Sequence, residues 1–308
     1  MKKKITIIGA GNVGATAAHW ALARRLGDIV LVDVMEGIPQ GKALDLWQCG
    51  PLDAYGGSVT GTNDYADTAG SDVVIITAGL ARKPGMSRDD LLAKNVAIVK
   101  SCAESAVRYS PDCVMIVVTN PIDAMVHTAY KVSGLPKNRI IGMAGVLDSA
   151  RYRTFLADAV GVAPQDVNAL VMGIHGDNML PLVRLANVGG VPITDLLSAD
   201  KIAEIVERTQ MGGIEIVNHL KTGSAFYTPG LAAVEMAEAV INDTKRVMAC
   251  AAYLDGEFSI SGYFLGVPVV LGEGGIERII EFKLTEEERL ALQQSVEVVA
   301  RQMEATGL

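Results

Sequence analysis

The first 145 residues alternate between short aliphatic runs and stretches with helical periodicity. Val73-Val74-Ile75-Ile76 and Val114-Met115-Ile116-Val117-Val118 are nearly continuous apolar runs. Such a run is buried on both faces, which is typical of a parallel sheet covered by helices. Strands are predicted at Lys4–Ile8, Ile29–Val34, Ser58–Gly61, Val73–Thr77, Cys113–Thr119 and Ile140–Met143. Helices are predicted between them at about 14–26, 39–49, 87–108 and 121–132.

The pattern of predicted elements changes after about residue 145, where the helical stretches are longer and the strand-like segments contain Gly and Pro. Helices are predicted at about 148–160, 200–221, 229–247 and 285–304, and strands at Val167–Gly173, Pro181–Leu185 and Val267–Leu271. Gly and Pro residues that mark turns between short strands are typical of antiparallel hairpins. Thr285 and Glu288 form a capping box that begins the last helix. The pattern therefore predicts a doubly wound α/β domain at 1–145 and an α+β domain at 146–308.

The composition fits this picture and excludes some functions. The chain has 308 residues, of which 50% are hydrophobic, and its length alone favours two domains. The net charge of −8 disfavours binding to the phosphate backbone of nucleic acids. The cysteines are far apart and form no C-x-x-C pair, which predicts reduced core residues of an intracellular protein; they are Cys49, Cys102, Cys113 and Cys250.

The N-terminal segment resembles a signal peptide only superficially. Three lysines precede an apolar stretch, but Gly9, Gly11, Gly14 and His19 interrupt it and suit a turn better. No run elsewhere reaches the roughly 18 apolar residues of a membrane span. We therefore expect a soluble protein with no membrane partner.

A glycine-rich motif follows the first predicted strand. Gly9-Ala10-Gly11-Asn12-Val13-Gly14 is a G-x-G-x-x-G sequence between a strand and a helix, and Asp33 closes the second strand. Gly9 permits the tight turn, Gly11 lets the backbone approach a pyrophosphate, and Gly14 lets helix and strand pack closely. The pyrophosphate is expected at the helix N-terminus, where N–H groups and the dipole favour an anion. This context predicts a Rossmann-type dinucleotide site.

The residue at the second strand end selects among dinucleotides. Asp33 is expected to accept hydrogen bonds from the adenosine ribose and to repel a 2′-phosphate, which favours NAD over NADP. FAD uses the same fingerprint and stays open on these residues alone, as does a glycine turn that binds nothing.

A loop rich in Gly and Pro follows the strand at Val73–Thr77. The segment 78–88 carries Arg82 and Arg88 six residues apart, at the sheet edge where open α/β folds bind ligands. Two arginines across a hinge-like loop suit a mobile lid, at about 79–90, that brings cations to an anionic substrate. An ordinary solvated basic loop is the alternative.

Two further clusters carry titratable groups. Asp148 and Arg151 are three residues apart, so they share a helix face, and a surface salt bridge is the simpler explanation. His175 stands between Ile174 and Gly176 in a Gly-rich turn, where a structural histidine is the commoner case. An enzyme that oxidises an alcohol with NAD, however, needs a general base, and a His–carboxylate pair supplies one. Arginines then hold the substrate carboxylate and polarise the carbonyl.

At these residues the chain resembles the lactate/malate dehydrogenase superfamily, most closely its prokaryotic lactate-dehydrogenase-like malate dehydrogenases. The motifs GAGNVG, AGLARKPGMSR, VVTNP, LDSAR and GIHGDNMLP occur in the family order over essentially the whole chain. The resemblance implies that His175 accepts the proton with Asp148 as its partner. It implies that Arg151 clamps the 1-carboxylate and that Arg88 is the lid arginine on the carbonyl.

The resemblance also implies contacts with the cofactor. Asn120 is expected to touch both nicotinamide and substrate, Asn95 to touch the cofactor, and Val118 and Thr119 to line the cofactor site. The implied cofactor is NAD, and the implied protein is a cytoplasmic homodimer or homotetramer of the tricarboxylic acid cycle. No metal is expected, since His19, His127, His175 and His219 have no ligand spacing.

The substrate prediction depends on Arg82. The family carries Arg at this position in malate enzymes and typically Gln in lactate enzymes. An arginine can pair with the second carboxylate of malate or oxaloacetate, but pyruvate leaves it unpaired in a partly dry pocket, and such discrimination reaches roughly 10⁴. Ala225 gives weak further support because it leaves room where lactate enzymes often carry threonine. The alternatives are an L-lactate dehydrogenase and, from another class, a non-catalytic NAD(H)-binding or redox-sensing module.

Overall fold

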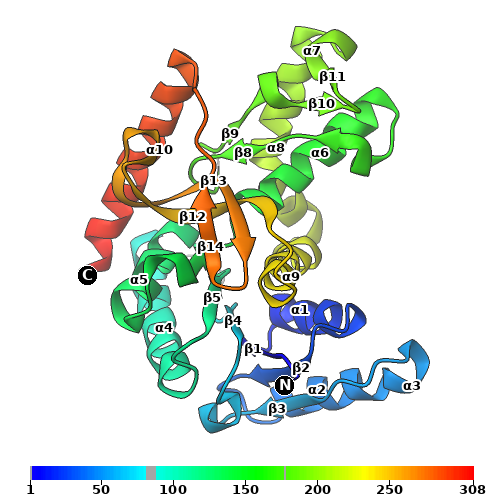
Figure 1. The fold of residues 1–308 in the computed structure, drawn as a ribbon, viewed down its shortest axis with the longest axis vertical. Helices are drawn as coiled ribbons and strands as arrows, with labels where there is room; N and C mark the ends of the chain where they lie inside the picture. The colour runs from blue at the N-terminus through cyan, green and yellow to red at the C-terminus, as the bar shows by residue number, and fades with distance from the viewer. Residues whose placement is uncertain (1, 81–87, 177) are drawn as a thin grey trace.

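The computed structural model describes residues 2–80, 88–176 and 178–308, and within them one nine-stranded sheet forms the centre of the molecule (Figure 1). Six parallel strands come from the first half: β1 (Lys4–Ile8), β2 (Asp28–Val32), β3 (Val59–Thr62), β4 (Val73–Ile76), β5 (Val114–Val117) and β6 (Ile140–Gly142). They lie in the order β3-β2-β1-β4-β5-β6, which is the doubly wound order. Each strand ends within two residues of its predicted bounds, so the expected Rossmann-type sheet is confirmed.

Three strands of the second half extend this same sheet. β12 (Arg246–Asp255) pairs antiparallel with β6, and β13 (Ser261–Gly272) and β14 (Gly275–Ile279) follow it, each antiparallel to the strand before. The helix predicted at 229–247 is therefore wrong at its end. Helix α9 stops at Ile241, and the alanine-rich sequence around Ala251 pairs with β6 and β13 because tertiary pairing overrides helix propensity.

Helices cover the sheet on both sides (Figure 1). On one side α4 (Arg88–Tyr109), α5 (Ile122–Ser133) and α10 (Glu286–Thr306) pack together. On the other side α1 (Asn12–Ala23) packs on α9 (Tyr227–Ile241), which contacts α6 (Gly145–Val160). Helix α2 (Ile38–Gln48) lies beside β3, and the short helix α3 (Gly50–Asp53) contacts α2. The Thr285 capping box of α10 is present as predicted.

A smaller α+β layer projects from α6. The predicted strand at Val167–Gly173 is split, because β7 (Val167–Asn168) pairs with β10 (Asn187–Val188) whereas β8 (Val171–Met172) pairs with β9 (Leu180–Pro181). The strand predicted at Pro181–Leu185 is wrong beyond its first residue, since Val183–Leu185 is a 3-10 turn. The layer also contains β11 (Val191–Pro192), α7 (Ile193–Leu196) and α8 (Ala199–Leu220). Other 3-10 turns occupy Tyr65–Thr68, Lys137–Arg139, Pro164–Asp166 and Glu257–Ser259.

The hydrophobic core does not divide at residue 145. One cluster of fully buried side chains runs from Ile5 and Ile75 in the parallel strands to Val267 in β13 and Val299 in α10. A second, smaller cluster surrounds Tyr152 between α6 and the small layer. The main core and the main sheet both continue across residue 145. The domain boundary predicted at 145/146 therefore stays a prediction.

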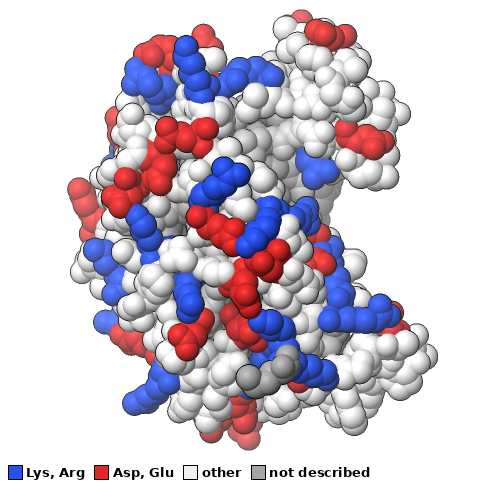
Figure 2. Space-filling model, viewed as in Figure 1, with Lys and Arg blue, Asp and Glu red and all other residues white. Residues whose placement is uncertain are grey.

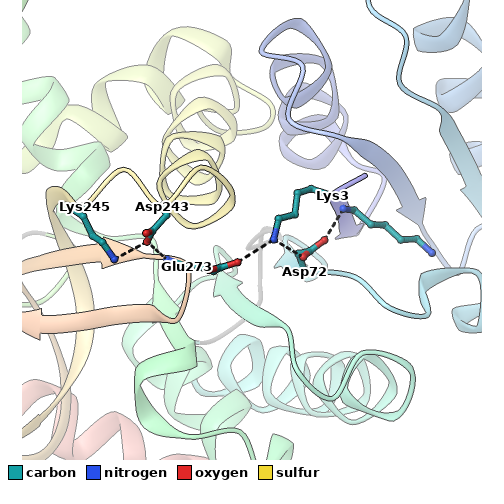
Figure 3. Close-up of polar contacts among 6 residues, drawn as sticks. Lys3, Asp72, Asp243, Lys245 and Glu273 are labelled. Atoms are coloured by element: carbon teal, nitrogen blue, oxygen red, sulfur yellow. Dashed lines mark hydrogen bonds and ion pairs between the residues drawn. The ribbon is translucent and has the colours of Figure 1, made fainter. Parts of the chain in front are cut away.

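An ionic network ties the start of β1 to the β13–β14 hairpin (Figure 3). The Lys3 ammonium lies 3.1 Å from an oxygen of Asp72 and 3.4 Å from one of Glu273, while Lys245 pairs with Asp243 at 2.7 Å. The backbone N–H of Glu273 donates to Asp243 at 2.8 Å. The network lies at the amino ends of the parallel strands, opposite the edge where α/β proteins bind ligands.

The exposed surface carries both signs of charge. On the face seen in Figure 2, blue and red side chains are interspersed, and neither sign forms one continuous patch. The four cysteines are free thiols. In the described parts of the chain, no helix is both long and apolar enough to span a membrane.

Candidate active site

The carboxyl ends of the parallel strands position most of the candidate residues. Gly9 follows β1, Asp33 follows β2, and Thr119 lies just beyond β5. The strand order reverses between β1 and β4, which is where a doubly wound sheet leaves a crevice for a ligand. The motifs that are far apart in the sequence are therefore brought to one edge.

The glycine-rich turn has the shape that its sequence predicts. Gly9 has φ of +106°, and a Cβ there would lie 2.7 Å from the Ala78 nitrogen. A Cβ on Gly14 would lie 1.8 Å from the carbonyl oxygen of Gly9, so no other residue permits this contact between helix and strand. A Cβ on Gly11 would meet nothing within 4 Å, which leaves the turn open on the ligand side.

The N-terminus of α1 is free to bind an anion. Gly11 is its N-cap residue and supplies no side-chain hydrogen bond to the first turn, which begins with Asn12. N–H groups in that turn lack partners within the helix, and the helix dipole favours negative charge there. An uncapped helix start beside an open turn fits the pyrophosphate of a dinucleotide.

Asp33 is fixed by the backbone of this turn. One oxygen of its carboxylate accepts from the Ala10 N–H at 2.6 Å and the other from the Met35 N–H at 3.0 Å. The Lys42 ammonium, from α2, donates to the Ala10 carbonyl at 2.6 Å on the same turn. The carboxylate is thus held at the end of β2, where the ribose of an adenosine is expected. Sequence spacing gave no signal for Lys42, because its partner is a backbone oxygen about thirty residues earlier.

Asp33→Asn tests this position. We expect the ratio of Kd for NADPH to Kd for NADH to fall about tenfold, because the substitution removes a like-charge repulsion of roughly 1.4 kcal/mol against the 2′-phosphate. Asp28→Asn is the matched control, since Asp28 lies at the opposite end of β2 and also binds a backbone N–H, that of Ser58. Fluorescence titration with both cofactors measures the ratio, and an unchanged ratio in Asp33→Asn would exclude this role.

The loop after β5 is held by a buried amide. The Asn95 side chain, 1% exposed, donates to the Asn120 carbonyl at 2.8 Å and accepts from the Leu80 N–H at 2.8 Å. The Thr119 hydroxyl donates to the Ala78 carbonyl at 2.7 Å. These bonds join the segments that follow β4 and β5, and the peptide bond between Asn120 and Pro121 is cis. The cofactor contact expected of Asn95 stays a prediction.

His175, Asp148 and Arg151 meet at the start of α6. The His175 Nδ1 lies 2.8 Å from one carboxylate oxygen of Asp148, and the Arg151 guanidinium lies 3.4 Å from the other. The side chain of Asp148 is 2% exposed, that of Arg151 13% and that of His175 16%. A surface salt bridge is therefore the wrong description of Asp148 and Arg151, and His175 is not an isolated turn histidine.

The electrostatics favour a positively charged imidazole. Burial alone would lower the pKa of His175, but the charge and hydrogen bond of Asp148, with the charge of Asp123, raise it above its ordinary value. Because the Asp148 carboxylate can only accept, Nδ1 carries a hydrogen and the tautomer is fixed. The other ring nitrogen, Nε2, is then the atom that exchanges a proton with a substrate.

His175 and Arg151 line a cavity of about 300 Å³. Four other residues considered in the sequence also line it: Val13, Val118, Asn120 and Ala225. Residues that were not predicted, among them Met143, Gln210 and Ile214, complete the lining. The structure thus places Ala225 at the site.

Two adjacent glycines in the interior of α8 make room for Arg151. A Cβ on Gly212 would lie 3.1 Å from the Arg151 Cδ, and one on Gly213 would lie 3.8 Å from its guanidinium. Glycine inside a helix costs about 1 kcal/mol relative to alanine. The glycine pair was not among the predicted site residues, although two adjacent glycines inside a predicted helix are a usable signal.

Part of the predicted site lies outside the described residues. Arg82 and most of the predicted lid at about 79–90 belong to the segment 81–87, and Asp177 is also outside. For Arg88 only the backbone is described, as the first residue of α4. Their expected contacts with the substrate therefore stay predictions.

Comparison with known proteins agrees with this geometry. The model of the lactate/malate dehydrogenase NAD-binding domain matches residues 3–142, and that of the lactate/malate dehydrogenase α/β C-terminal domain matches residues 145–306. The chain belongs to the lactate/malate dehydrogenase family. This family membership establishes an NAD-dependent 2-hydroxy acid dehydrogenase and confirms the resemblance seen in the motifs.

Individual relatives cover the chain from end to end. A malate dehydrogenase of Desulforudis audaxviator is 58% identical over 97% of this chain and 96% of its own length, and one of Rhodopirellula baltica is 57% identical over 97% and 95%. The solved malate dehydrogenase of Cryptosporidium parvum has a TM-score of 0.97 at 46% identity and covers 100% and 99% of the two chains. The lactate dehydrogenase of the same organism, solved with lactic acid and NAD, has a TM-score of 0.96 at 43% identity, with 100% and 98% covered. The backbone alone therefore does not separate the two substrates.

Proposed function

We propose that this protein is an NAD-dependent malate dehydrogenase, which transfers a hydride reversibly between (S)-malate and NAD+ to give oxaloacetate and NADH. The observation that carries the proposal is the buried pairing of His175 with Asp148 and Arg151. His175 and Arg151 line a cavity bordered by the dinucleotide turn and the end of β5. Family membership and the similarity to the malate dehydrogenases of Desulforudis audaxviator and Rhodopirellula baltica support it.

The reaction follows from the placement of these side chains. In malate oxidation, Nε2 of His175 accepts the proton of the substrate hydroxyl as a hydride leaves the carbon that bears this hydroxyl. NAD, when bound, supplies the hydride acceptor. The Asp148 carboxylate stabilises the resulting imidazolium and keeps the ring in its reactive orientation. In the reverse direction, His175 returns the proton to the developing alkoxide.

Arginines are proposed to orient the substrate. Arg151 would hold the 1-carboxylate through two parallel hydrogen bonds, which fixes the direction of the reacting carbon. Arg88 would polarise the carbonyl as negative charge develops on it, and Arg82 would pair with the second carboxylate. These roles rest on the family motifs and on the position of Arg151 in the cavity.

A specific observation keeps L-lactate dehydrogenase as the second candidate. The lactate enzyme of Cryptosporidium parvum resembles this chain almost as closely as the malate enzyme of that organism does. Arg82 favours malate, because pyruvate has no second carboxylate to neutralise it.

Turnover separates an enzyme from a non-catalytic NAD(H)-binding module. The absorbance of NADH is followed after oxaloacetate is added to the purified protein, and NADH binding is measured separately by fluorescence. We expect both binding and rapid oxidation of NADH. A protein that binds NADH but oxidises none of it with any 2-oxo acid would contradict the proposal.

We also propose a homodimer or homotetramer that acts in the cytoplasm in the tricarboxylic acid cycle. The family resemblance supports all three proposals, and exposed apolar side chains on α2 and α3 support the oligomer, since Trp47 is 58% and Leu52 89% exposed. Light scattering is expected to give a multiple of the chain mass of 32.5 kDa. A particle of the single-chain mass would contradict the oligomer.

A further inference from the structure

A second buried carboxyl lies beside the proton-transferring histidine. Asp123 is 1% exposed and stands in the first turn of α5, three residues after Asn120. Among the residues that the structure describes, its Oδ1 has no hydrogen-bond partner. Burying a carboxyl with an unsatisfied oxygen is unfavourable, so its presence at this place calls for an explanation.

The surroundings of Asp123 point to His175. The backbone N–H of His175 hydrogen-bonds to the carboxyl, and the imidazole acts on it through its charge. The other described ionisable group that acts on Asp123 is Asp148, from α6, and Arg151 acts in turn on His175. Among the described ionisable groups that act on Asp123, His175 is the one that favours its charged form.

Burial and charge act on this carboxyl in opposite directions. Burial and the charge of Asp148 raise the pKa of Asp123 to about 7, against the opposing effect of the His175 charge and of hydrogen bonds from the backbone of His175 and of Asp123 itself. The N-terminal dipole of α5 also favours an anion in the first turn. The negative form is therefore most stable when His175 carries its proton.

We propose that Asp123 is a positioning residue for proton transfer, because its buried carboxyl, bonded to the His175 backbone, stabilises the imidazolium that malate oxidation creates and oxaloacetate reduction consumes. The inference rests on the proposed function. It assigns the imidazolium two carboxylates: Asp148, bonded to the ring, and Asp123, which acts through space.

The test is the pH dependence of kcat/KM in Asp123→Asn, which keeps the shape of the side chain and removes its charge. Oxaloacetate reduction needs protonated His175, so its rate falls as pH rises through the pKa of His175; malate oxidation needs neutral His175, so its rate rises there. Without the negative charge the pKa of His175 is lower. We expect the falling limb of the profile for oxaloacetate reduction and the rising limb of the profile for malate oxidation both to move toward lower pH, by about one unit.

His127→Asn is the matched control. His127 lies one turn further along α5, is buried, and has an Nδ1 without a partner among the described residues. Burial and Lys131 lower its pKa to about 4, and His175 is not among the groups that act on it. This variant perturbs the same helix, and we expect it to keep the wild-type pH limbs.

The outcomes separate this inference from the proposed function. Suppose that the wild type is active and that Asp123→Asn folds and binds NADH. An Asp123→Asn pH profile that matches that of the wild type would then overturn the inference alone. A wild type that does not reduce oxaloacetate at any pH overturns the proposed function and this inference with it. Asp123→Ser, which cannot overpack the site, is the second variant. Loss of folding in both variants would assign the carboxyl to the fold alone and overturn the inference.

Discussion

The His175→Asn enzyme is expected to bind NADH as tightly as the wild type and to reduce oxaloacetate at least about 100-fold more slowly. Asparagine is close in size to the part of the ring that meets Asp148, but it cannot exchange a proton near neutral pH. The proton must then come from water, while hydride donation is unaffected. The loss is expected in kcat, measured at saturating NADH and oxaloacetate.

The control for this variant is His219→Asn. His219 lies on the exposed last turn of α8 and does not line the cavity. We expect wild-type turnover from it. Full turnover by His175→Asn would refute the assignment of the proton donor, whereas loss of NADH binding would mean that His175 supports the cofactor site instead.

The Arg82→Gln enzyme is expected to lose most of its preference for oxaloacetate over pyruvate. Glutamine cannot neutralise the second carboxylate of oxaloacetate, and it no longer leaves an unpaired charge when pyruvate is bound. Each of these two effects is worth a few kcal/mol in a closed pocket, so the ratio of kcat/KM values should fall about 10³-fold.

Lys83→Gln is the matched control for Arg82→Gln, because it removes one positive charge from the neighbouring position of the same loop. If general attraction of dianions caused the preference, the two variants would change the ratio alike. We expect Lys83→Gln to leave the ratio near its wild-type value. An unchanged ratio in Arg82→Gln would show that another residue discriminates between the substrates.

The parallel half of the fold was predictable because its strands are buried on both faces. Continuous aliphatic runs such as Val73–Ile76 leave no alternative to a covered central strand. The second half was predicted less well. Strand β12 contains the sequence Met248-Ala249-Cys250-Ala251-Ala252, whose local preference is helical, and only its pairing with β6 and β13 makes it a strand.

The site divides in a similar way. Short motifs were enough to propose Gly9, Asp33 and His175, since each motif carries its own backbone context. Asp123 and Lys42 could not be proposed, because their partners are backbone groups distant in sequence. Burial and hydrogen bonding of such groups depend on tertiary packing that no local pattern encodes.

The central claim is that the site is built for a dicarboxylate. The measurement that tests it most directly is the ratio of kcat/KM for oxaloacetate to that for pyruvate, with NADH and the wild-type enzyme. We predict a preference for oxaloacetate of about 10³-fold or more. Equal values, or a faster reaction with pyruvate, would contradict the claim and identify the protein as a lactate-type enzyme.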